Sequence, residues 1–250
     1  PKTPKPHADD TYIEKMTGLD QCKMQAINMT TLLVNLGIAF LTPMGNIGNA
    51  TQKEISDEMA LGIQPAGWAF SIWSVIYLLL TAFAVYQALP ASVASSRNND
   101  FIFNEIGWLW SINMLVGSTW VPVFQQNTGA AFVAANLIML VMTLTALLMS
   151  KKTVNASLST FENISLKAGL SLYSGWLCSA FILQTAISLK KTGISDGWDE
   201  VTWTIIMLWV AFVIFIGNSL LNGDAIFSAV FIWTCTAIHA KNNTGNESVQ

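Results

Sequence analysis

The stretch from Ile106 to Ser150, IGWLWSINMLVGSTWVPVFQQNTGAAFVAANLIMLVMTLTALLMS, contains no aspartate, glutamate, lysine or arginine. An uncharged run of this length is enough for two bilayer crossings of about 20 residues each. Only the polar residues QQNT and their neighbours separate the two apolar halves, so we expect an antiparallel helical hairpin. This stretch by itself predicts an integral membrane protein.

The composition of the whole chain agrees with that prediction. Of its 250 residues, 52% are hydrophobic and 11% are charged. In an ordinary soluble domain, about 25% of the residues are charged. So little charge could not cover a water-soluble fold of this size. Because lipid offers the backbone no hydrogen-bond partner, long apolar runs must cross it as helices, and the expected fold is an all-α, polytopic membrane helical bundle.

Apolar runs long enough to span a bilayer occur seven times, which predicts about seven transmembrane helices. Pro65 and Pro90 bound the second run, as expected for residues that punctuate helix ends. The polar segment NIGNATQKEISDEMALGIQ, residues 46–64, is expected to be a structured loop outside the membrane. The predicted spans are approximately Asn28–Asn46, Ala66–Leu89, Ile106–Gln125, Gly129–Ser150, Leu166–Leu189, Val201–Leu221 and Ala225–Ala240.

The distribution of basic residues predicts the orientation of the chain in its membrane. Seven spans would place the two termini on opposite sides, and positive charges favour the inside. The side of the N-terminus carries Lys2, Lys5, Lys15, Lys23, Arg97, Lys151, Lys152 and Lys167. The other side carries Lys53, Lys190, Lys191 and Lys241. We therefore expect an inside N-terminus and an outside C-terminus, in a membrane that the sequence does not identify.

The sequence also argues against several classes of function. No dense basic cluster with interleaved aromatics is present, so nucleic acid is not an expected partner. Cys22, Cys178 and Cys235 lack a metal-site spacing, and the spans contain essentially none of the titratable groups that acid–base catalysis needs. A lysine for retinal and a histidine pair for haem are also missing from the spans. We expect no catalytic residues, no metal site and no obligatory cofactor.

Tryptophan is unusually frequent, with ten residues in the chain. An aromatic belt at the membrane interface accounts for Trp198, Trp203 and Trp108. Others lie deeper in their spans, at Trp120, Trp176 and Trp209.

Aromatic residues also share helical faces. Phe70, Trp73 and Tyr77 follow an i, i+3, i+7 spacing, and Tyr173, Trp176 and Ala180 lie on one face of the fifth span. Such faces are typical of helix packing, and equally of a cavity in which a flat apolar ligand stacks on aromatic rings. Periodicity alone leaves both interpretations open.

Three separated motifs resemble the TspO/MBR family, the translocator proteins and tryptophan-rich sensory proteins. They are IQPAGWAFSIWSVIYLLL at residues 63–80, PMGNIGNATQKEISD at 43–57 and SLYSGW at 171–176. The order of the motifs is most similar to a long branch with seven spans. The chain departs from the family pattern in the spacing of Trp68 and Trp73, which requires a rearranged helix start, and at Gly117 and Leu172, where asparagine and proline are usual.

The resemblance implies a five-helix core that encloses a pocket, with the loop between the first two helices as its lid. It divides the chain into a polar N-terminal tail (1–27), a TspO-like membrane domain (28–190), two additional transmembrane helices (191–241) and a polar C-terminal tail (242–250). The pocket residues that it implies are Trp68, Phe70, Trp73, Tyr77, Trp120, Tyr173, Trp176 and Ala180.

The function implied is the binding of a planar hydrophobic molecule, of tetrapyrrole or sterol type, for transport or sensing, without enzymatic activity. The expected partners are membrane lipids, this small molecule, and either a second copy of the chain or other membrane proteins. The alternative interpretation is a structural accessory subunit of a larger membrane complex, because Gly117 and Leu172 depart from the family's pocket pattern.

Overall fold

The computed structural model describes residues 8–42, 47–59 and 61–247, with side chains between residues 20 and 243. Within these residues the fold is entirely helical. The α-helices are α1 (Ala8–Leu41), α2 (Gln52–Met59), α3 (Ile72–Ala88), α4 (Gly107–Phe124), α5 (Gly129–Thr153), α6 (Thr160–Glu162), α7 (Gly169–Lys191), α8 (Glu200–Asn222) and α9 (Ala225–Glu247). A 3-10 turn, Gly67–Ser71, precedes α3, and π-helical turns at Phe101–Ile106 and Asn163–Ala168 precede α4 and α7.

All seven predicted spans contain a long helix, and the prediction of a polytopic helical membrane bundle is confirmed. The first helix differs from expectation because it begins at Ala8, well before Asn28, and ends at Leu41; residues 43–46 of that predicted span lie outside the described residues. By length and hydropathy, five described segments qualify as membrane spans: Asp20–Leu41, Gly67–Ala88, Gly129–Thr153, Thr160–Lys191 and Glu200–Asn222. Seven crossings therefore stay a prediction.

Several helix boundaries have local chemical causes. Thr128 accepts a hydrogen bond from Ala131 N at 3.2 Å and thereby caps α5. Asp199 caps α8 in the same way, through Thr202 N at 2.8 Å. Gly223 ends α8 with a φ of +63°, a left-handed conformation that favours glycine. Thr128 and Asp199 therefore define where α5 and α8 begin, and Gly223 defines where α8 ends.

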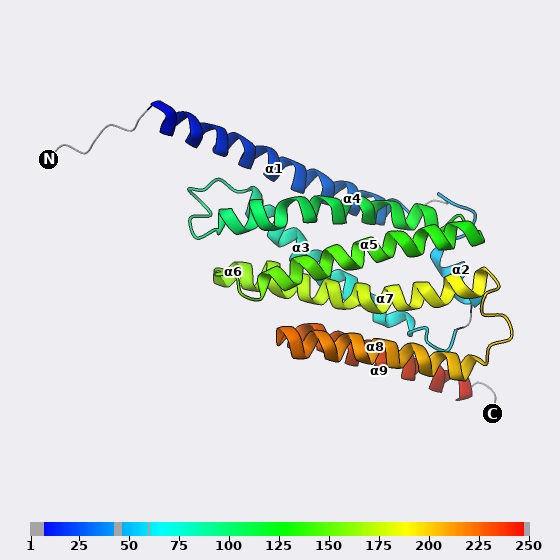
Figure 1. Ribbon diagram of the computed structural model, residues 1–250. Helices are drawn as coiled ribbons and strands as arrows, with labels where there is room; N and C mark the ends of the chain where they lie inside the picture. The colour runs from blue at the N-terminus through cyan, green and yellow to red at the C-terminus, as the bar shows by residue number, and fades with distance from the viewer. Residues whose placement is uncertain (1–7, 43–46, 60, 248–250) are drawn as a thin grey trace.

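The long helices run up and down in one bundle (Figure 1). Helix α4 packs between α1 and α5, and α5 packs along α7. The pair α8–α9 covers another side of α7, and α9 also contacts the 3-10 turn before α3. Helix α1 begins at one end of the bundle and α9 finishes at the other (Figure 1).

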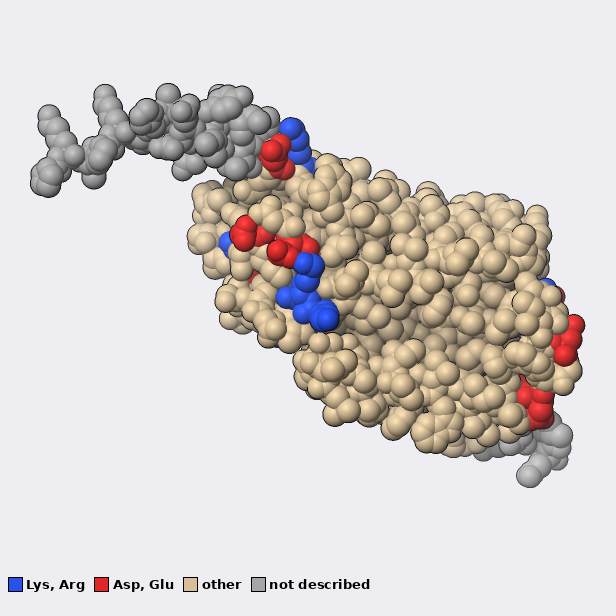
Figure 2. All heavy atoms as spheres, viewed as in Figure 1, with Lys and Arg blue, Asp and Glu red and all other residues tan. Residues whose placement is uncertain are grey.

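On the face shown in Figure 2, charged side chains gather toward the two ends of the molecule and leave an uncharged belt between them. Large apolar side chains are exposed on this belt, among them Trp209 at 63% and Val213 at 66% on α8. A belt of exposed apolar helix between two charged ends matches the hydrocarbon core of a bilayer with water on both sides. The chain is therefore an integral, multi-pass membrane protein.

Buried polar contacts lock the central helices together. Asn28 on α1 accepts hydrogen bonds from Trp110 Nε1 at its backbone carbonyl and from Ser111 Oγ at its side chain, at 3.1 and 2.7 Å. Asn113 on α4 donates to Met142 O on α5 at 2.8 Å and accepts from the Tyr173 hydroxyl on α7 at 2.7 Å. Interhelical hydrogen bonds of this kind stabilise membrane bundles. They fix the helix faces that surround the site.

Candidate ligand-binding cavity

A cavity of about 440 Å³ lies inside the bundle. The loop that carries α2 covers one end of it and contributes Gln52 and Ser56 to the lining. Its wall is formed by α1, α3, α4, α5 and α7, and the pair α8–α9 completes it on one side. Ligand sites in proteins typically have volumes of about 300–1,000 Å³ and mostly apolar linings. The cavity therefore has the size and character of a site for a small molecule.

The structure brings together most of the residues that the sequence proposed for a pocket. Seven of the eight line this cavity: Phe70, Trp73, Tyr77, Trp120, Tyr173, Trp176 and Ala180. They come from α4, α7, α3 and the turn before α3.

Trp68 is the exception, because it does not line the cavity. It lies in the 3-10 turn Gly67–Ser71, which sets a different angular phase from the α-helix that begins at Ile72. Its ring meets Trp233 of α9 edge to face, with ring centroids 4.8 Å apart, and is 45% exposed. The rearranged helix start that the sequence spacing required is this turn, and it directs Trp68 to α9.

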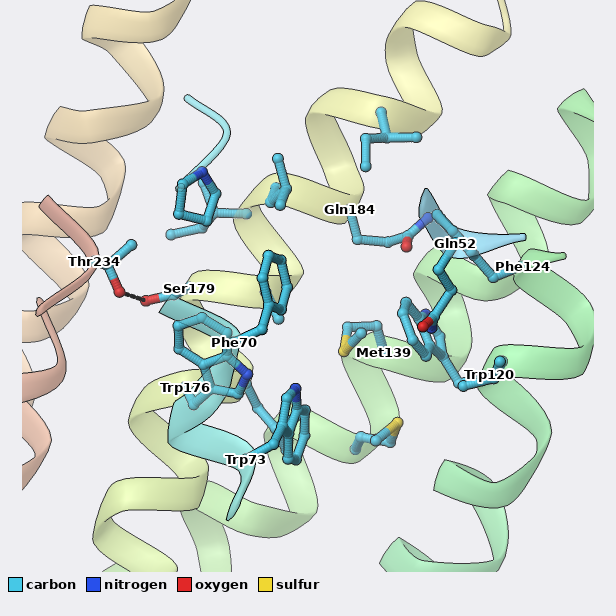
Figure 3. Close-up of a pocket in the computed structure, with 18 of the residues that line it drawn as sticks. Gln52, Phe70, Trp73, Trp120, Phe124, Met139, Trp176, Ser179, Gln184 and Thr234 are labelled. Atoms are coloured by element: carbon cyan, nitrogen blue, oxygen red, sulfur yellow. Dashed lines mark hydrogen bonds between the residues drawn. The ribbon is translucent and has the colours of Figure 1, made fainter. Parts of the chain in front are cut away.

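Two aromatic walls face the cavity from different helices (Figure 3). On one wall, Trp73 stacks on Tyr77 at a centroid distance of 5.2 Å and meets Trp176 edge to face at 6.4 Å. On the other wall, Trp120 stacks on Phe124 at 5.1 Å. Ring pairs in these geometries stabilise one another by about 0.5–1.5 kcal/mol beyond the burial of their area. The space between the walls suits a flat ligand whose faces contact rings.

An amide from α1 lies against Gly117, the position where the family pattern has asparagine. A Cβ atom added to Gly117 would lie 3.0 Å from Asn35 Nδ2. Asn35 donates a hydrogen bond to Met114 O at 3.0 Å and also lines the cavity. The sequence analysis missed Asn35. The sequence does contain a signal for it, because Asn28, Thr31 and Asn35 follow an i, i+3, i+7 spacing. Such a polar face on a membrane helix is expected to pack against protein and not against lipid.

The last two helices also contribute to the lining, which the sequence analysis did not foresee. The α8 residues are Leu208 and Ala211, and the α9 residues are Phe231, Thr234, Cys235 and Ile238. The α9 residues follow an i, i+3, i+4, i+7 spacing, so this face could have been found from the sequence. The Thr234 hydroxyl lies 3.1 Å from Ser179 Oγ, which joins α9 to α7 beside the cavity (Figure 3).

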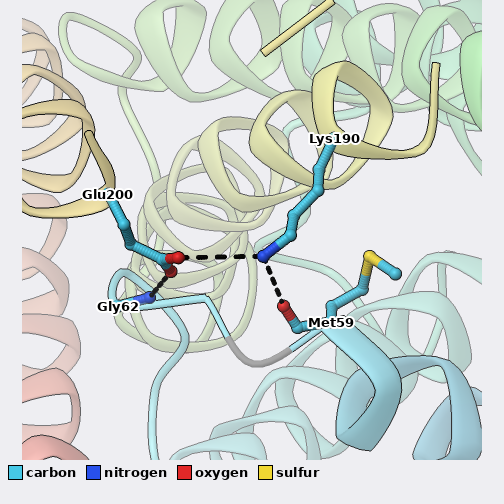
Figure 4. Close-up of polar contacts among 4 residues, drawn as sticks. All are labelled: Met59, Gly62, Lys190 and Glu200. Carbon is cyan, nitrogen blue, oxygen red and sulfur yellow. Dashed lines mark hydrogen bonds and ion pairs between the residues drawn. The ribbon is translucent and has the colours of Figure 1, made fainter. Parts of the chain in front are cut away.

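The loop over the cavity is fastened to α7 and α8 by polar contacts (Figure 4). Lys190 Nζ donates to Met59 O at 3.2 Å and lies 3.7 Å from the Glu200 carboxylate. Glu200 in turn accepts a hydrogen bond from Gly62 N at 2.9 Å. These contacts hold the end of α2 and the following loop against the ends of two long helices.

A second ion pair and a backbone contact fasten the rest of the loop. Lys191 Nζ lies 2.8 Å from Glu58, and this hydrogen bond and charge lower the pKa of Glu58 from its ordinary value of 4.5. At the start of the loop, Asn49 N donates to Gln125 O at 2.8 Å. A Cβ on Gly48 would lie 2.3 Å from Gln125 O, so only glycine fits this close approach. The loop therefore covers one end of the cavity and is held there by polar contacts at both of its ends.

The lining carries no charged side chain among the residues that the structure describes. In the same part of the chain, no group of three or more histidine, cysteine, aspartate or glutamate side chains could hold a metal ion. What the walls offer is aromatic surface with a few amides, hydroxyls and indole N–H groups.

Membrane-length helices packed around an internal aromatic cavity define the class: an integral, multi-pass helical membrane protein. The family model described as TSPO-like protein matches residues 25–250, and the chain belongs to this family. The match includes α8 and α9 as well as the first five long helices. Comparison with curated proteins and comparison with solved structures each gave no match.

Proposed function

We propose that the chain is a non-enzymatic membrane protein that binds a planar hydrophobic small molecule, of tetrapyrrole or sterol type, for transport or sensing. One observation carries this proposal: the 440 Å³ cavity between the wall of Trp73 and Trp176 and the wall of Trp120. Burial of apolar surface contributes about 25 cal/mol for each Å² removed from water. Offset or edge-to-face contacts with aromatic rings add about 0.5–1.5 kcal/mol each.

The lid supports the same function. The loop with α2 contributes Gln52, Ser56 and Gln64 to the lining. The loop is held by the polar contacts described above and by the buried side chains of Ile55 and Met59 on α2. Because it is a short segment and not a membrane-length helix, it is the part of the wall that opens at least cost. A ligand reaching the cavity from the aqueous side passes this loop.

The test is a binding titration of the full chain in uncharged detergent. The tetrapyrrole probe is protoporphyrin dimethyl ester, which quenches tryptophan fluorescence, and the sterol probe is dehydroergosterol, which accepts energy from tryptophan. We expect saturable binding of at least one probe. Ala180→Phe, which fills space in the cavity wall, should weaken it about tenfold or more, a loss of about 1.4 kcal/mol.

The matched control is Ala229→Phe, which adds the same ring to an exposed position on α9 outside the cavity lining. This variant should bind as the wild type does. Absence of saturable binding for both probes, or equal binding by Ala180→Phe and wild type, would contradict the proposal. A partner protein that copurifies stoichiometrically would then favour the accessory-subunit interpretation.

A further inference from the structure

The cavity wall contains unpaired polar atoms of two kinds. Nε1 of Trp120, Nε1 of Trp176 and Oε1 of Gln64 have no hydrogen-bond partner and almost no accessible surface, because neighbouring atoms seal them. A sealed atom does not meet a ligand unless the wall rearranges. Gln184 Oε1 on α7 is different: no described residue donates to it, and it is not one of the sealed atoms. This oxygen is available to a ligand.

Ser188 fixes the orientation of the Gln184 amide. Gln184 Nε2 lies 3.3 Å from Ser188 Oγ. The single hydroxyl hydrogen of Ser188 is directed to a backbone carbonyl, since its Oγ lies 2.9 Å from Phe132 O and 2.8 Å from Gln184 O. The hydroxyl must therefore accept from the Gln184 side chain, and only the amide nitrogen can donate. The amide oxygen is left on the side toward Met139 and Trp120, as Figure 3 shows.

This oxygen lies in deeply buried surroundings. Only 2% of the surface of Gln184 is exposed. An amide oxygen is a hydrogen-bond acceptor and cannot donate. A ligand group without a hydrogen to give would exclude water from this oxygen and leave it unpaired, which is unfavourable in a buried site. The complementary group on a ligand is therefore a hydrogen-bond donor.

Gln184 also marks one end of the cavity. It follows Trp176 and Ala180 on one face of α7, two turns or about 12 Å beyond Trp176 at 1.5 Å per residue. The same helix ends at Lys191, which contacts Glu58 in the loop with α2. The amide therefore lies nearer to this loop than the ring of Trp176 does. A flat apolar molecule with a single polar end matches this arrangement.

We infer that the cavity is a site for a planar apolar alcohol, whose hydroxyl group donates a hydrogen bond to Gln184 Oε1 while its ring system lies between the aromatic walls. This inference rests on the proposed function and deepens it, because it selects the sterol type over the tetrapyrrole type. In a porphyrin, the N–H groups point to the centre of the ring and do not reach a side chain at its edge. Gln184 sets the specificity, and Ser188, which does not line the cavity, is its positioning residue.

The experiment compares two probes with the same ring system, dehydroergosterol and its 3-methyl ether. The ether keeps the oxygen but lacks the hydrogen that Gln184 accepts. Both probes are titrated into the full chain in nanodiscs of uncharged lipid and followed by energy transfer from tryptophan, and empty nanodiscs measure partition into lipid. We expect the alcohol to bind about five- to tenfold more tightly than the ether, the value of one hydrogen bond to a buried group.

A second arm removes the acceptor. Gln184→Met keeps the length of the side chain without the amide, so it should weaken binding of the alcohol about five- to tenfold and abolish the preference over the ether. A preference due only to the bulk of the ether's methyl group would persist in this variant. Gln21→Met is the matched control outside the lining. Asn35→Leu removes another buried amide of the lining whose oxygen has no donor, and should keep the preference.

A third arm tests the positioning residue. Ser188→Ala frees the Gln184 amide to turn its N–H groups toward the cavity. Binding of the alcohol should weaken about two- to threefold, and binding of the ether should strengthen, because the ether oxygen then gains a donor. A loss of packing alone would weaken both probes. A thermal melt of each variant verifies folding, and the wild-type and Ser188→Ala comparisons do not depend on Gln184→Met.

The outcomes separate this inference from the proposed function. Equal binding of the alcohol and the ether by the wild type would overturn the inference and leave the proposed function standing. A preference that survives in folded Gln184→Met, or that is lost in folded Asn35→Leu, would do the same. Parallel changes for both probes in Ser188→Ala would overturn its positioning role. If neither sterol probe nor protoporphyrin dimethyl ester binds saturably, the proposed function fails, and the inference fails with it.

Discussion

Replacing Gly117 with alanine would place a methyl group 3.0 Å from Asn35 Nδ2 and 3.1 Å from Met142 Cε. Both distances are shorter than ordinary van der Waals contact, so at least one neighbour must move. The Met142 thioether is the end of a flexible side chain and can yield. Asn35 has less freedom, because its amide is held by the 3.0 Å hydrogen bond to Met114 O. The asparagine of α1 therefore bears most of the strain.

Two opposing terms set the size of the effect. Exchange of glycine for alanine in a helix interior stabilises the fold by about 0.5–1 kcal/mol, because the unfolded chain loses conformational freedom. Overpacking of a buried contact costs about 1–3 kcal/mol. We expect Gly117→Ala to destabilise the bundle by a net amount of about 1 kcal/mol.

A double-mutant cycle with Asn35→Ala isolates the contact. Asn35→Ala alone removes one hydrogen bond, worth about 1 kcal/mol. In the double variant the added methyl group has room, so the two losses should fall short of additivity by about 1 kcal/mol. Unfolding by dodecyl sulfate in mixed micelles, followed by tryptophan fluorescence, measures the three free energies. Gly37→Ala is the control, since a Cβ there meets nothing within 4 Å.

The reasoning is refuted if the two variants are additive, or if Gly117→Ala is as harmless as Gly37→Ala. Either result would mean that Asn35 does not occupy the space beside Gly117. The family-like pocket would then lack an amide at this level of the bundle.

Tyr173→Phe removes the donor to Asn113 Oδ1, a buried acceptor, and should destabilise the fold by about 1–3 kcal/mol. Unfolding by dodecyl sulfate should show almost no change for Tyr86→Phe, which loses only a long exposed contact. In the lid, Lys191 lowers the pKa of Glu58 below 4.5, so the pair stabilises the lid above that pH and is lost as pH falls through the lowered value. Hydrogen exchange of α2 should therefore be slower in wild type than in Lys191→Met at about pH 6. This difference should begin to shrink as the pH falls below 4.5 and should disappear once the pH is below the lowered pKa of Glu58; a difference that persists when Glu58 is protonated would contradict the pairing.

The elements that the sequence predicts best are those with a strong local signal. The fourth span was expected from Gly129 to Ser150, and α5 runs from Gly129 to Thr153, because the uncharged run and the cap at Thr128 leave little choice. The start of α1 was less visible. Its polar first turns lie outside the apolar run, and hydropathy marks where a helix enters lipid rather than where it begins.

The lining of the cavity was harder to predict than the helices. It depends on the direction in which each side chain points from its helix and on which distant helices pack beside it. Trp73 and Tyr77 share an α-helix, so their common face follows from spacing. Trp68 stands before the helix on a 3-10 turn, and its direction depends on the exact residue at which that turn becomes α-helix. The contributions of Asn35 and Ile238 need the packing of α1 and α9, which involves contacts between distant parts of the chain.

The cavity wall combines residues from near both ends of the chain, Asn35 on α1 and Ile238 on α9. During synthesis, α1 leaves the ribosome before α9. Until α8 and α9 are inserted, the side of the cavity that Leu208, Ala211 and the α9 residues line is therefore open. The wall is completed only when α9 is inserted, so a chain that stops before α9 would retain the cavity-lining tryptophans and lack the enclosure.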